Sequence, residues 1–542
     1  MRVNKKGIFV VVFFGGILLT STVLFALPPP APTMLEGENE IGVTKTGTPM
    51  DNYPDDQRAT FCGVEDAKSN SYITEYKIPT VCSQPLAIKV TPDGNVWFVE
   101  TNAGKIAKFN PESEKFTEFE NELWPEQARS MSWGMDYSPD GSLWYTDGRF
   151  NTIWKFSTIN ETYQPISYPV GSTDSELNID DALPQKLEID GSNIFVNDFT
   201  GGKITVFGLT QNIDEQKYVS ILNPIPDGFT GDFAVDSEDY LWYTNWIPEK
   251  DGFLVKFDLE KYQMDVSYDV DETTTLENYI DVFDFPIGLN TANGLTIDFD
   301  DNVWIVDTSS SFFFKFNPET EEFTKYVTTV PDITTFGNAT GLIKSPISRP
   351  YWIQTDNNGN MVFNEQTSNQ IAIFDKHNES LIEYMIPSKN PNWADCGFSS
   401  KSNCGISQVF GFDVIEGEIW FTEWAENNIG VVDTRKPLPF SLEFDKESLS
   451  LKKGQSEKIT MSITHNDISD SVKIKSSHTA SSTTNFSDII ITSSDIIQGN
   501  TEDVIFTILA NDLALSGDYK VLLGIANDDV TVTQYIDVSI ES

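Results

Sequence analysis

Acidic side chains recur at one fixed place in a repeated unit along most of the chain. Seven short apolar stretches each have a central residue, and the residue three positions later is a carboxylate in six of them and an amide in the fourth. These residues are Glu100, Asp147, Asp198, Asn245, Asp307, Glu365 and Glu423. Carboxylates gathered in one place can bind a divalent cation or transfer protons. Each can also accept hydrogen bonds from the N–H groups of its own turn, and we favour this interpretation because nearly every unit has the feature.

A second set of positions, at the start of each unit's first strand, differs from unit to unit. The residues there are Leu86, Trp133, Gln185, Asp232, Asn293, Tyr351 and Phe410. A pocket that holds one ligand in one orientation needs such variation. Trp133, Tyr351 and Phe410 could stack on an apolar or ring-shaped ligand, with Asn293 and Asp232 as polar ligand-binding residues. The alternative is that the aromatic side chains only fill the centre of the fold.

Histidine, the most common acid–base residue, is scarce. The histidines are His377, His465 and His478, and none stands at the start of a unit's first strand. Imidazole catalysis at those positions is therefore not supported. The sequence also contains no Gly-x-Ser-x-Gly elbow, phosphate-binding loop or His-Glu-x-x-His motif.

The elements that must position these residues are short strands in a long repeat. The strand centres are Trp97, Trp144, Phe195, Trp242, Trp304, Val362 and Trp420, at spacings of 47 to 62 residues. Each unit has four strands separated by Gly, Asp, Asn or Pro turns, which is typical of a propeller blade. The last unit lacks its fourth strand, and a spare copy stands at residues 72–79. We therefore predict an all-β chain with a seven-bladed β-propeller, in which residues 72–79 complete the seventh blade.

The repeated units resemble those of the virginiamycin B lyase (streptogramin lyase) family and, more distantly, the gluconolactonases. Residues 92–100 and 418–430 carry the likeness, which extends over residues 72–434. It implies a seven-bladed ring, a magnesium ion and the linearisation of a cyclic depsipeptide by elimination. The base of that family is a histidine in a first strand of the late blades. Tyr351 and Phe410 stand at the matching positions, and Glu423 matches a glutamate of the last blade.

The N-terminal residues have the features of an export signal. Basic residues precede an uncharged stretch at residues 8–27, which is long enough to span a bilayer as a helix. We favour an uncleaved anchor over a cleaved signal peptide, because no clear cleavage site precedes the prolines that follow. The expected organisation is 1–27 signal anchor or signal peptide, 28–70 stalk, 71–436 propeller and 437–542 immunoglobulin-like β-sandwich. The sandwich is suggested by alternating strands and by a tyrosine-corner-like sequence at Tyr519.

Cysteines and charge agree with an exported protein, anchored on the outer face of the membrane or secreted. The cysteines favour the disulfides Cys396–Cys404 and Cys62–Cys82, while the other two connectivities and a zinc site are weaker alternatives. The net charge of −46 argues against nucleic acid as a partner. We expect a monomer. Sequons of the form Asn-x-Ser/Thr begin at Asn160, Asn338, Asn378 and Asn485.

Two functions remain open. The first is a cell-surface or secreted propeller that binds a small-molecule or peptide ligand, including a cyclic one, on its central face. The second is a metal-assisted lyase or lactone hydrolase, in which Glu365 and Glu423 hold Mg²⁺ or Ca²⁺ and take part in catalysis. Tyr351 would then be the base, which requires a strongly depressed pKa. We favour the first function, because both matched histidine positions have changed.

Overall fold

The computed structural model describes residues 62–541 with several internal gaps. The gaps are residues 64, 125–129, 149, 170–181, 210–217, 226–227, 248–249, 251, 266–277, 333–334, 336–346, 395, 397–403, 467–471, 481, 484–485 and 494–502. The predicted anchor and most of the predicted stalk lie outside the described residues, as do Asn338 and Asn485. In the part of the chain that is described, no helix combines the length and the apolar character needed to cross a bilayer.

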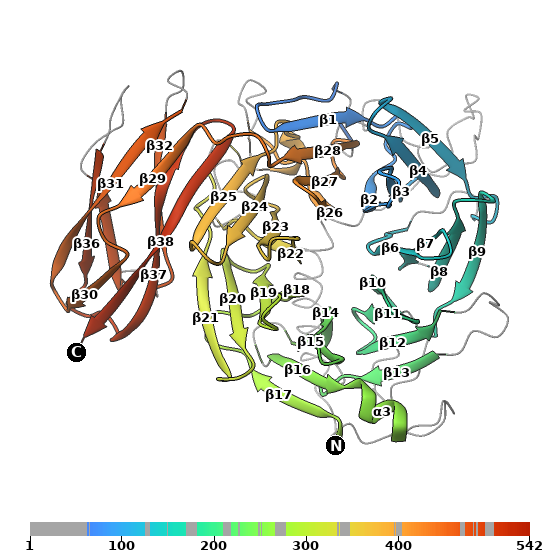
Figure 1. Ribbon diagram of the computed structural model, residues 1–542, viewed down its shortest axis with the longest axis horizontal. Coiled ribbons are helices and arrows are strands. Elements are labelled where there is room, and N and C mark those ends of the chain that lie inside the picture. Colours follow the sequence, from blue (N-terminus) through green and yellow to red (C-terminus); the bar gives the residue numbers. More distant parts are fainter. Residues whose placement is uncertain are drawn as a thin grey trace, which may run out of the picture.

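Each repeat forms an antiparallel sheet of four short strands, and the sheets stand around a common centre as in a β-propeller (Figure 1). The sheets of the first three repeats are β2 (Pro85–Val90), β3 (Val96–Glu100), β4 (Lys105–Asn110) and β5 (Lys115–Glu120); β6 (Met135–Ser138), β7 (Ser142–Asp147), β8 (Thr152–Ser157) and β9 (Thr162–Ser167); and β10 (Pro184–Asp190), β11 (Asn193–Asp198), β12 (Lys203–Gly208) and β13 (Tyr218–Leu222).

The next sheets continue in the same order around the centre. They are β14 (Phe229–Val235), β15 (Tyr240–Trp246), β16 (Gly252–Asp258) and β17 (Ile280–Asp284); β18 (Ala292–Ile297), β19 (Val303–Asp307), β20 (Phe312–Asn317) and β21 (Glu322–Val327); and β22 (Pro350–Thr355), β23 (Met361–Glu365), β24 (Gln370–Asp375) and β25 (Ser380–Met385). The last repeat gives β26 (Val409–Ile415), β27 (Glu418–Glu423) and β28 (Asn428–Asp433). Two short helices, α3 (Leu259–Asp265) and η4 (Pro391–Trp393), lie in connections.

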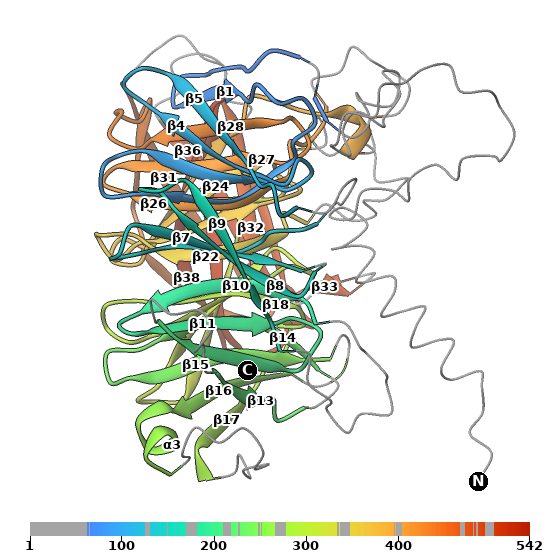
Figure 2. The ribbon, with the colours of Figure 1, turned by 90° about the vertical axis from the view of Figure 1, so that its right-hand side faces the viewer.

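The last sheet is completed by a strand from the other end of the described chain. β1 (Ile73–Lys77) pairs antiparallel with β28, from Ile73 opposite Val432 to Lys77 opposite Asn428. Figures 1 and 2 show the two strands side by side. The prediction that residues 72–79 supply this outer strand is confirmed. The pairing covers the edge of β28, whose backbone groups would otherwise be unpaired.

Neighbouring sheets are joined near the centre by ion pairs between their first strands. The ammonium of Lys89 in β2 lies 3.0 Å from Asp136 in β6 and 3.5 Å from Asp413 in β26. Lys186 in β10 lies 2.7 Å from Asp232 in β14. These contacts join β26 to β2, β2 to β6 and β10 to β14, and apolar side chains fill the space further out between the sheets.

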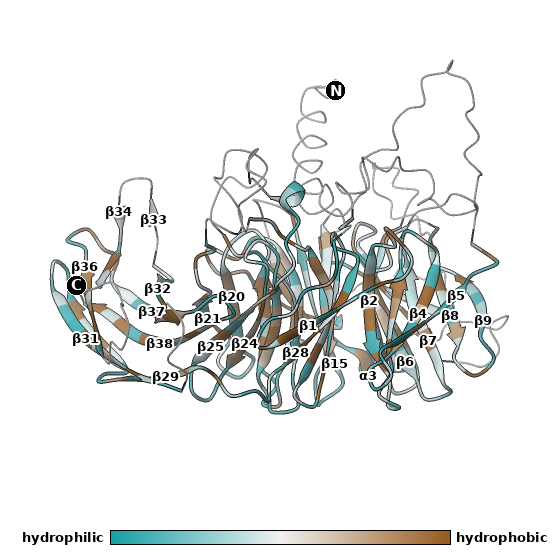
Figure 3. Cartoon of the chain, turned by 90° about the horizontal axis from the view of Figure 1, so that it is seen from above, coloured by the Kyte–Doolittle hydropathy of each residue, from teal (hydrophilic) through white to brown (hydrophobic). Residues whose placement is uncertain are grey.

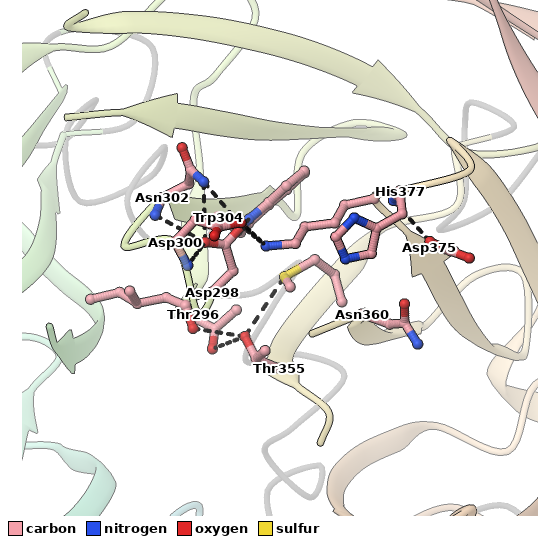
Figure 4. A network of polar contacts seen from close by, with 12 residues as sticks. Thr296, Asp298, Asp300, Asn302, Trp304, Thr355, Asn360, Asp375 and His377 are labelled. Atoms are coloured by element: carbon pink, nitrogen blue, oxygen red, sulfur yellow. Dashed lines mark hydrogen bonds and ion pairs between the residues drawn. The ribbon is translucent and has the colours of Figure 1, made fainter. Parts of the chain in front are cut away.

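In every sheet, the second strand ends on the same face of the ring, which we call the crown face. The opposite face, which we call the turn face, carries the turns that join the first strand to the second and the third strand to the fourth. In the β18–β19 turn, Asp298 accepts hydrogen bonds from the backbone N–H groups of Asp300 at 2.9 Å and Asn302 at 3.1 Å (Figure 4). The ammonium of Lys376, in the next sheet, lies 2.9 Å from Asp298 and 2.7 Å from Asp300. The turn face is therefore held by carboxylates that cap their own backbone.

The C-terminal residues form two further sheets beside the ring (Figure 3). One sheet contains β29 (Phe440–Phe444), β31 (Ser456–His465), β36 (Asp503–Ala510) and β35 (Ile489–Ser493), and the other contains β30 (Ser448–Lys452), β38 (Val530–Glu541), β37 (Gly517–Ala526) and β32 (Lys473–His478). A small hairpin consists of β33 (Ser482–Thr483) and β34 (Phe486–Ser487). At the expected tyrosine corner, the hydroxyl of Tyr519 donates to the carbonyl of Leu515 at 2.9 Å.

One C-terminal sheet is continuous with a propeller sheet. β38 pairs with β25, from Ser380 opposite Gln534 to Tyr384 opposite Val530, so that the strands form an 8-stranded sheet. The sequence analysis placed a boundary at residue 436, but backbone hydrogen bonds join the parts on either side of it. The physical reason is that β25 is an outer strand with a free edge, which β38 covers.

Candidate functional site on the crown face

Four of the seven repeated acidic or amide positions accept backbone hydrogen bonds. Asp147, Asp198 and Asp307 accept them from the turn that follows, as the favoured interpretation of the sequence predicted, whereas Asn245 accepts from Ile225, 20 residues earlier. Asp198 accepts hydrogen bonds from the backbone N–H groups of Leu183 at 2.8 Å and Gly201 at 2.9 Å. Asp307 accepts one from the N–H group of Thr291 at 2.8 Å. The other two residues that accept backbone N–H groups are Asp147 and Asn245. Because their acceptor groups are used in this way, these four positions have a structural role.

The three glutamates of the set differ, because each lies close to a second glutamate on the outer strand of its own sheet. The pairs are Glu100 with Glu118, Glu365 with Glu383, and Glu423 with Glu75. Each outer glutamate accepts hydrogen bonds from the N–H and the O–H of one residue, which is Thr80, Thr329 and Ser388, respectively. At Glu118, burial is outweighed by the hydrogen bonds from Thr80 and by Lys105, which lower its pKa, whereas burial raises the pKa of Glu383 despite the donors of Thr329.

Burial and like charge raise the pKa of the inner glutamates. Glu423 is fully buried, and burial followed by the charge of Glu75 raises its pKa well above the ordinary glutamate value. Burial and the charge of Glu383 raise the pKa of Glu365 in the same way. Nearby hydroxyl groups temper that rise, but neither carboxyl oxygen of Glu365 has a hydrogen-bond partner of normal geometry among the described residues. Since metal ligands must be deprotonated, this environment disfavours cation binding.

The expected metal ligands, Glu365 and Glu423, therefore stand in separate carboxyl pairs. The charge that acts most on each of them comes from its own sheet. Within the described ranges, no three His, Cys, Asp or Glu side chains gather closely enough to hold a metal ion. The residues present do not fit a cation shared by Glu365 and Glu423, and we derive no catalytic step through Mg²⁺ or Ca²⁺.

The three aromatic residues of the first strands pack on one another. The ring centroid of Trp133 lies 5.9 Å from that of Tyr351 and 5.3 Å from that of Phe410. The ring centroids of Tyr351 and Phe410 are 5.8 Å apart. Their side chains are exposed by only 8%, 2% and 0%, and they form one apolar cluster that also contains Leu86. This arrangement favours the interpretation that they fill the centre of the fold over the one in which they stack on a ligand.

Tyr351 does not fit the role of a general base. Burial raises the pKa of its hydroxyl above the ordinary tyrosine value, although the nearby guanidinium of Arg349 opposes the change. A tyrosine base needs the opposite shift. At the position of the family histidine, the structure thus places a side chain that retains its proton.

The two predicted polar ligand-binding residues are largely occupied by the protein itself. Asp232 pairs with Lys186 and accepts the N–H of Leu295 at 3.1 Å, and burial raises its pKa to about 6 even though Lys186 lowers it. The amide nitrogen of Asn293 donates to the hydroxyl of Thr308 at 3.1 Å. The carbonyl oxygen of Asn293 has no partner among the described residues and is the one group of this pair that can receive a ligand.

The structure points to crown-face residues that the sequence analysis missed, directly after each repeated acidic position. They are Thr101, Gly148, Phe199, Trp246, Thr308, Gln366 and Trp424. Four of them have a buried polar atom with no hydrogen-bond partner in the described part of the chain: Thr101 Oγ1, Trp246 Nε1, Gln366 Nε2 and Trp424 Nε1. We call these atoms the four unpaired donors. The sequence does contain a signal for these residues, because their type varies from unit to unit directly after a position that is nearly constant.

One of the four unpaired donors belongs to the central aromatic cluster. Trp424 packs against Phe410 and Trp393, with ring centroids 6.1 Å and 5.0 Å apart. Trp246 packs in a separate apolar cluster, with Phe199. Buried donors without acceptors are uncommon in proteins, and a bound ligand or water that accepts hydrogen bonds would satisfy them. Recognition of an acceptor oxygen on the crown face is therefore best supported beside Trp424.

Both favoured disulfides are present, and both lie near this face. Cys62 is joined to Cys82 and Cys396 to Cys404, with Cα–Cα distances of 5.1 Å and 5.7 Å. Directly after Cys62, the N–H of Gly63 donates to the carbonyl of Ala425 at 2.6 Å, beside Trp424 in the sequence. The start of the described chain is thus fastened to the crown face.

The sequence and the structure were compared with those of known proteins. No protein-family model matches the sequence, and no curated protein matches it. Virginiamycin B lyase from Staphylococcus aureus is 19% identical with a TM-score of 0.48, over 67% of this chain and 98% of that one. A streptogramin B lyase is 20% identical with a TM-score of 0.48, over 66% and 96%. The calcium-binding protein regucalcin from Agrobacterium tumefaciens is 10% identical with a TM-score of 0.35, over 56% and 89%. The resemblance to virginiamycin B lyase that was drawn from the repeated units is thus also found among solved structures.

Proposed function

We propose that this chain is an exported binding protein whose propeller holds a small or cyclic ligand on its crown face. The observation that carries the proposal is the set of four unpaired donors at the ends of the second strands, of which Trp424 belongs to the central aromatic cluster. An indole N–H can only donate, and so the ligand must present acceptor oxygens to Trp246 and Trp424. Carbonyl groups of a peptide or an ester fit this requirement without a charge.

Binding without turnover is favoured by the residues at the centre. Tyr351 and Phe410 occupy the two positions where the lyase family has histidine, and both are buried in apolar contacts. One retains its proton and the other has none to exchange. A ligand held by the four unpaired donors would meet no base at these two positions.

The alternative is a metal-assisted lyase or lactone hydrolase. Its one supporting observation is that the carboxyl oxygens of Glu365 have no partner of normal geometry among the described residues, and burial, which raises the pKa of Glu365, acts against it. Melting curves with and without millimolar Mg²⁺ or Ca²⁺, and then with a chelator, separate the two functions. A ligand at about 100 times its dissociation constant stabilises a protein by about 2.7 kcal/mol. A cation-dependent shift that is lost in Glu365→Gln would favour the enzyme.

The same proposal covers organisation and location. We propose one closed ring of seven blades followed by an immunoglobulin-like C-terminal sandwich. We further propose that the chain is a monomer and is exported through its N-terminal segment, after which it is either attached to the membrane or secreted. The β1–β28 pairing and the Tyr519 hydrogen bond support the first two. Two disulfides are consistent with an oxidising compartment.

The experiment is a titration with a cyclic depsipeptide, followed by tryptophan fluorescence and by mass spectrometry. We expect saturable quenching and an unchanged ligand mass. Gln366→Ala should weaken binding several-fold, since one hydrogen bond is worth about 1 kcal/mol. The exposed Asn358→Ala on the turn face is the matched control and should bind as the wild type does. Linearised product would overturn the binding-only function, and equal affinity of Gln366→Ala would remove this residue from the site.

A further inference from the structure

Two sequons occupy the same turn in two different sheets. Asn160 lies in the turn between β8 and β9, and Asn378 lies in the turn between β24 and β25. The residue after each asparagine is a glutamate with positive φ, 56° for Glu161 and 46° for Glu379. The hydroxyl residue that completes each sequon is the first residue of the outer strand. The two acceptor motifs therefore share one backbone geometry.

Both asparagines are accessible. Asn160 and Asn378 are exposed. The amide nitrogen of Asn378 donates to Asp375 at 2.6 Å on the surface. Figure 4 shows Asp375 and His377 of the same turn. Since this contact is solvent-exposed, releasing the amide would break no buried interaction.

Corresponding turns of two other sheets provide an internal contrast. They follow Asn110, the last residue of β4, and Asn317, the last residue of β20, and a proline follows each of these asparagines. Neither triplet has Ser or Thr at its third position. Glu114 and Glu321 have the positive φ of Glu161 and Glu379, but Ser113 and Thr320 stand where the sequons have asparagine. The same kind of turn thus occurs without an acceptor at this position, and Asn110 and Asn317 serve as nearby asparagines outside a sequon.

These turns all lie on the turn face. In an antiparallel four-stranded sheet, the second strand ends at one edge of the ring and the third strand ends at the opposite one. In the sheet of β6–β9 this is visible as a contact between two turns, because the hydroxyl of Thr158 donates to the carbonyl of Gly141 at 2.7 Å. A group attached to Asn160 or Asn378 would therefore point away from the four unpaired donors.

We propose that Asn160 and Asn378 carry N-linked glycans, which leave the crown face free for its ligand. The side-chain amide nitrogen attacks C1 of a sugar carried on a lipid phosphate or pyrophosphate. The N–C1 bond forms as the bond between C1 and the phosphate oxygen breaks, the amide proton passes to a base, and the lipid phosphate leaves. The proposal rests on export, which brings the chain to the transferase, and not on the identity of the ligand.

The test uses the full chain, produced in a host whose export pathway performs N-glycosylation. Glycopeptide mass spectrometry should find a glycan on Asn160 and on Asn378 and none on Asn110 or Asn317. Asn160→Gln and Asn378→Gln should each remove one glycan. Ser380→Ala should remove the same glycan as Asn378→Gln while leaving the asparagine in place.

The cysteines report separately on export. Protein with Cys62 and Cys82 oxidised but with both asparagines unmodified would overturn the glycosylation proposal and leave export standing. Protein with reduced cysteines and no glycan would overturn both. A glycan at Asn160 that persists in Thr162→Ala would show that the sequon is not what directs the modification, which also overturns the proposal.

Discussion

Replacing Glu423 by glutamine isolates the titration of one buried carboxyl group. Because burial and the charge of Glu75 raise the pKa of Glu423, the folded protein keeps a proton there that the unfolded chain loses above about pH 4.3. Folding then takes up a proton, and the free energy of unfolding falls as pH rises. For one such group the slope is about 1.4 kcal/mol per pH unit, until the pH passes the folded-state pKa.

The amide of Glu423→Gln has the shape of the protonated acid and does not titrate. We therefore expect the variant to gain stability relative to the wild type by about 1.4 kcal/mol for each pH unit within that window, and then to reach a plateau. Urea unfolding followed by circular dichroism, at several values between about pH 5 and pH 8, measures the difference. Parallel pH dependences of the two proteins would refute the assignment of a proton to Glu423.

The partner of Glu423 supplies the matched control. Glu75 accepts hydrogen bonds from the N–H of Lys68 at 2.8 Å and the N–H of Ser388 at 2.9 Å, which suit a carboxylate. Glu75→Gln should therefore destabilise the protein, by about 2 kcal/mol for the weakened charged hydrogen bonds. Glu112→Gln, on an exposed turn, should leave both the stability and its pH dependence unchanged.

Three further perturbations follow from the contacts between sheets. Lys89→Met leaves Asp136 and Asp413 without their cation and should lower the free energy of unfolding by about 2 kcal/mol, between the values typical of exposed and buried pairs. In urea unfolding, the loss should be smaller when Lys89→Met is combined with Asp413→Asn, and equal losses in the single and double variants would contradict the pairing. Deletion of residues 72–79 exposes the edge of β28 and should abolish the single cooperative melting transition, whereas an unchanged melt would show that β1 does not close the ring. Phe410→Ala opens a cavity in the central aromatic cluster and should cost about 3 to 5 kcal/mol; weakened ligand binding at unchanged stability would instead show that the ring contacts the ligand.

The repeat could be predicted from the sequence because each unit contains the same local structural features. A tight turn, a central aromatic residue and a facing strand recur. Trp144 pairs with Lys155 on the neighbouring strand, and Trp304 pairs with Lys315 in the same way. The displaced outer strand was also readable, since residues 72–79 lacked a sheet and the last repeat lacked a strand. The pairing of β38 with β25 was not, because strand addition at a free edge depends on backbone geometry and needs no particular side chain.

The candidate site was less predictable, because its properties depend on what lies across the sheet. Asp198 and Glu365 hold equivalent positions in the sequence, but the shorter side chain reaches its own loop while the longer one lies beside Glu383. The same spacing of 18 residues joins Glu365 to Glu383 and Glu100 to Glu118, but it becomes meaningful only once the outer strand is seen to lie beside the inner glutamate. The indole of Trp424 likewise becomes informative only when it is seen to be buried without an acceptor among the described residues.

The three glutamate pairs lie in consecutive sheets of the ring, those of β22, β26 and β2. These are the sheets where the two ends of the propeller chain meet and where β38 joins β25. In the middle one, Glu75 belongs to β1 itself, so a charge on Glu423 would lie beside a carboxyl group of the strand that completes the last sheet. Burial, followed by the proximity of Glu75, raises the pKa of Glu423 and so opposes that charge. The carboxyl groups that the sequence suggested for metal binding are thus better explained by their place beside the outer strands of these sheets.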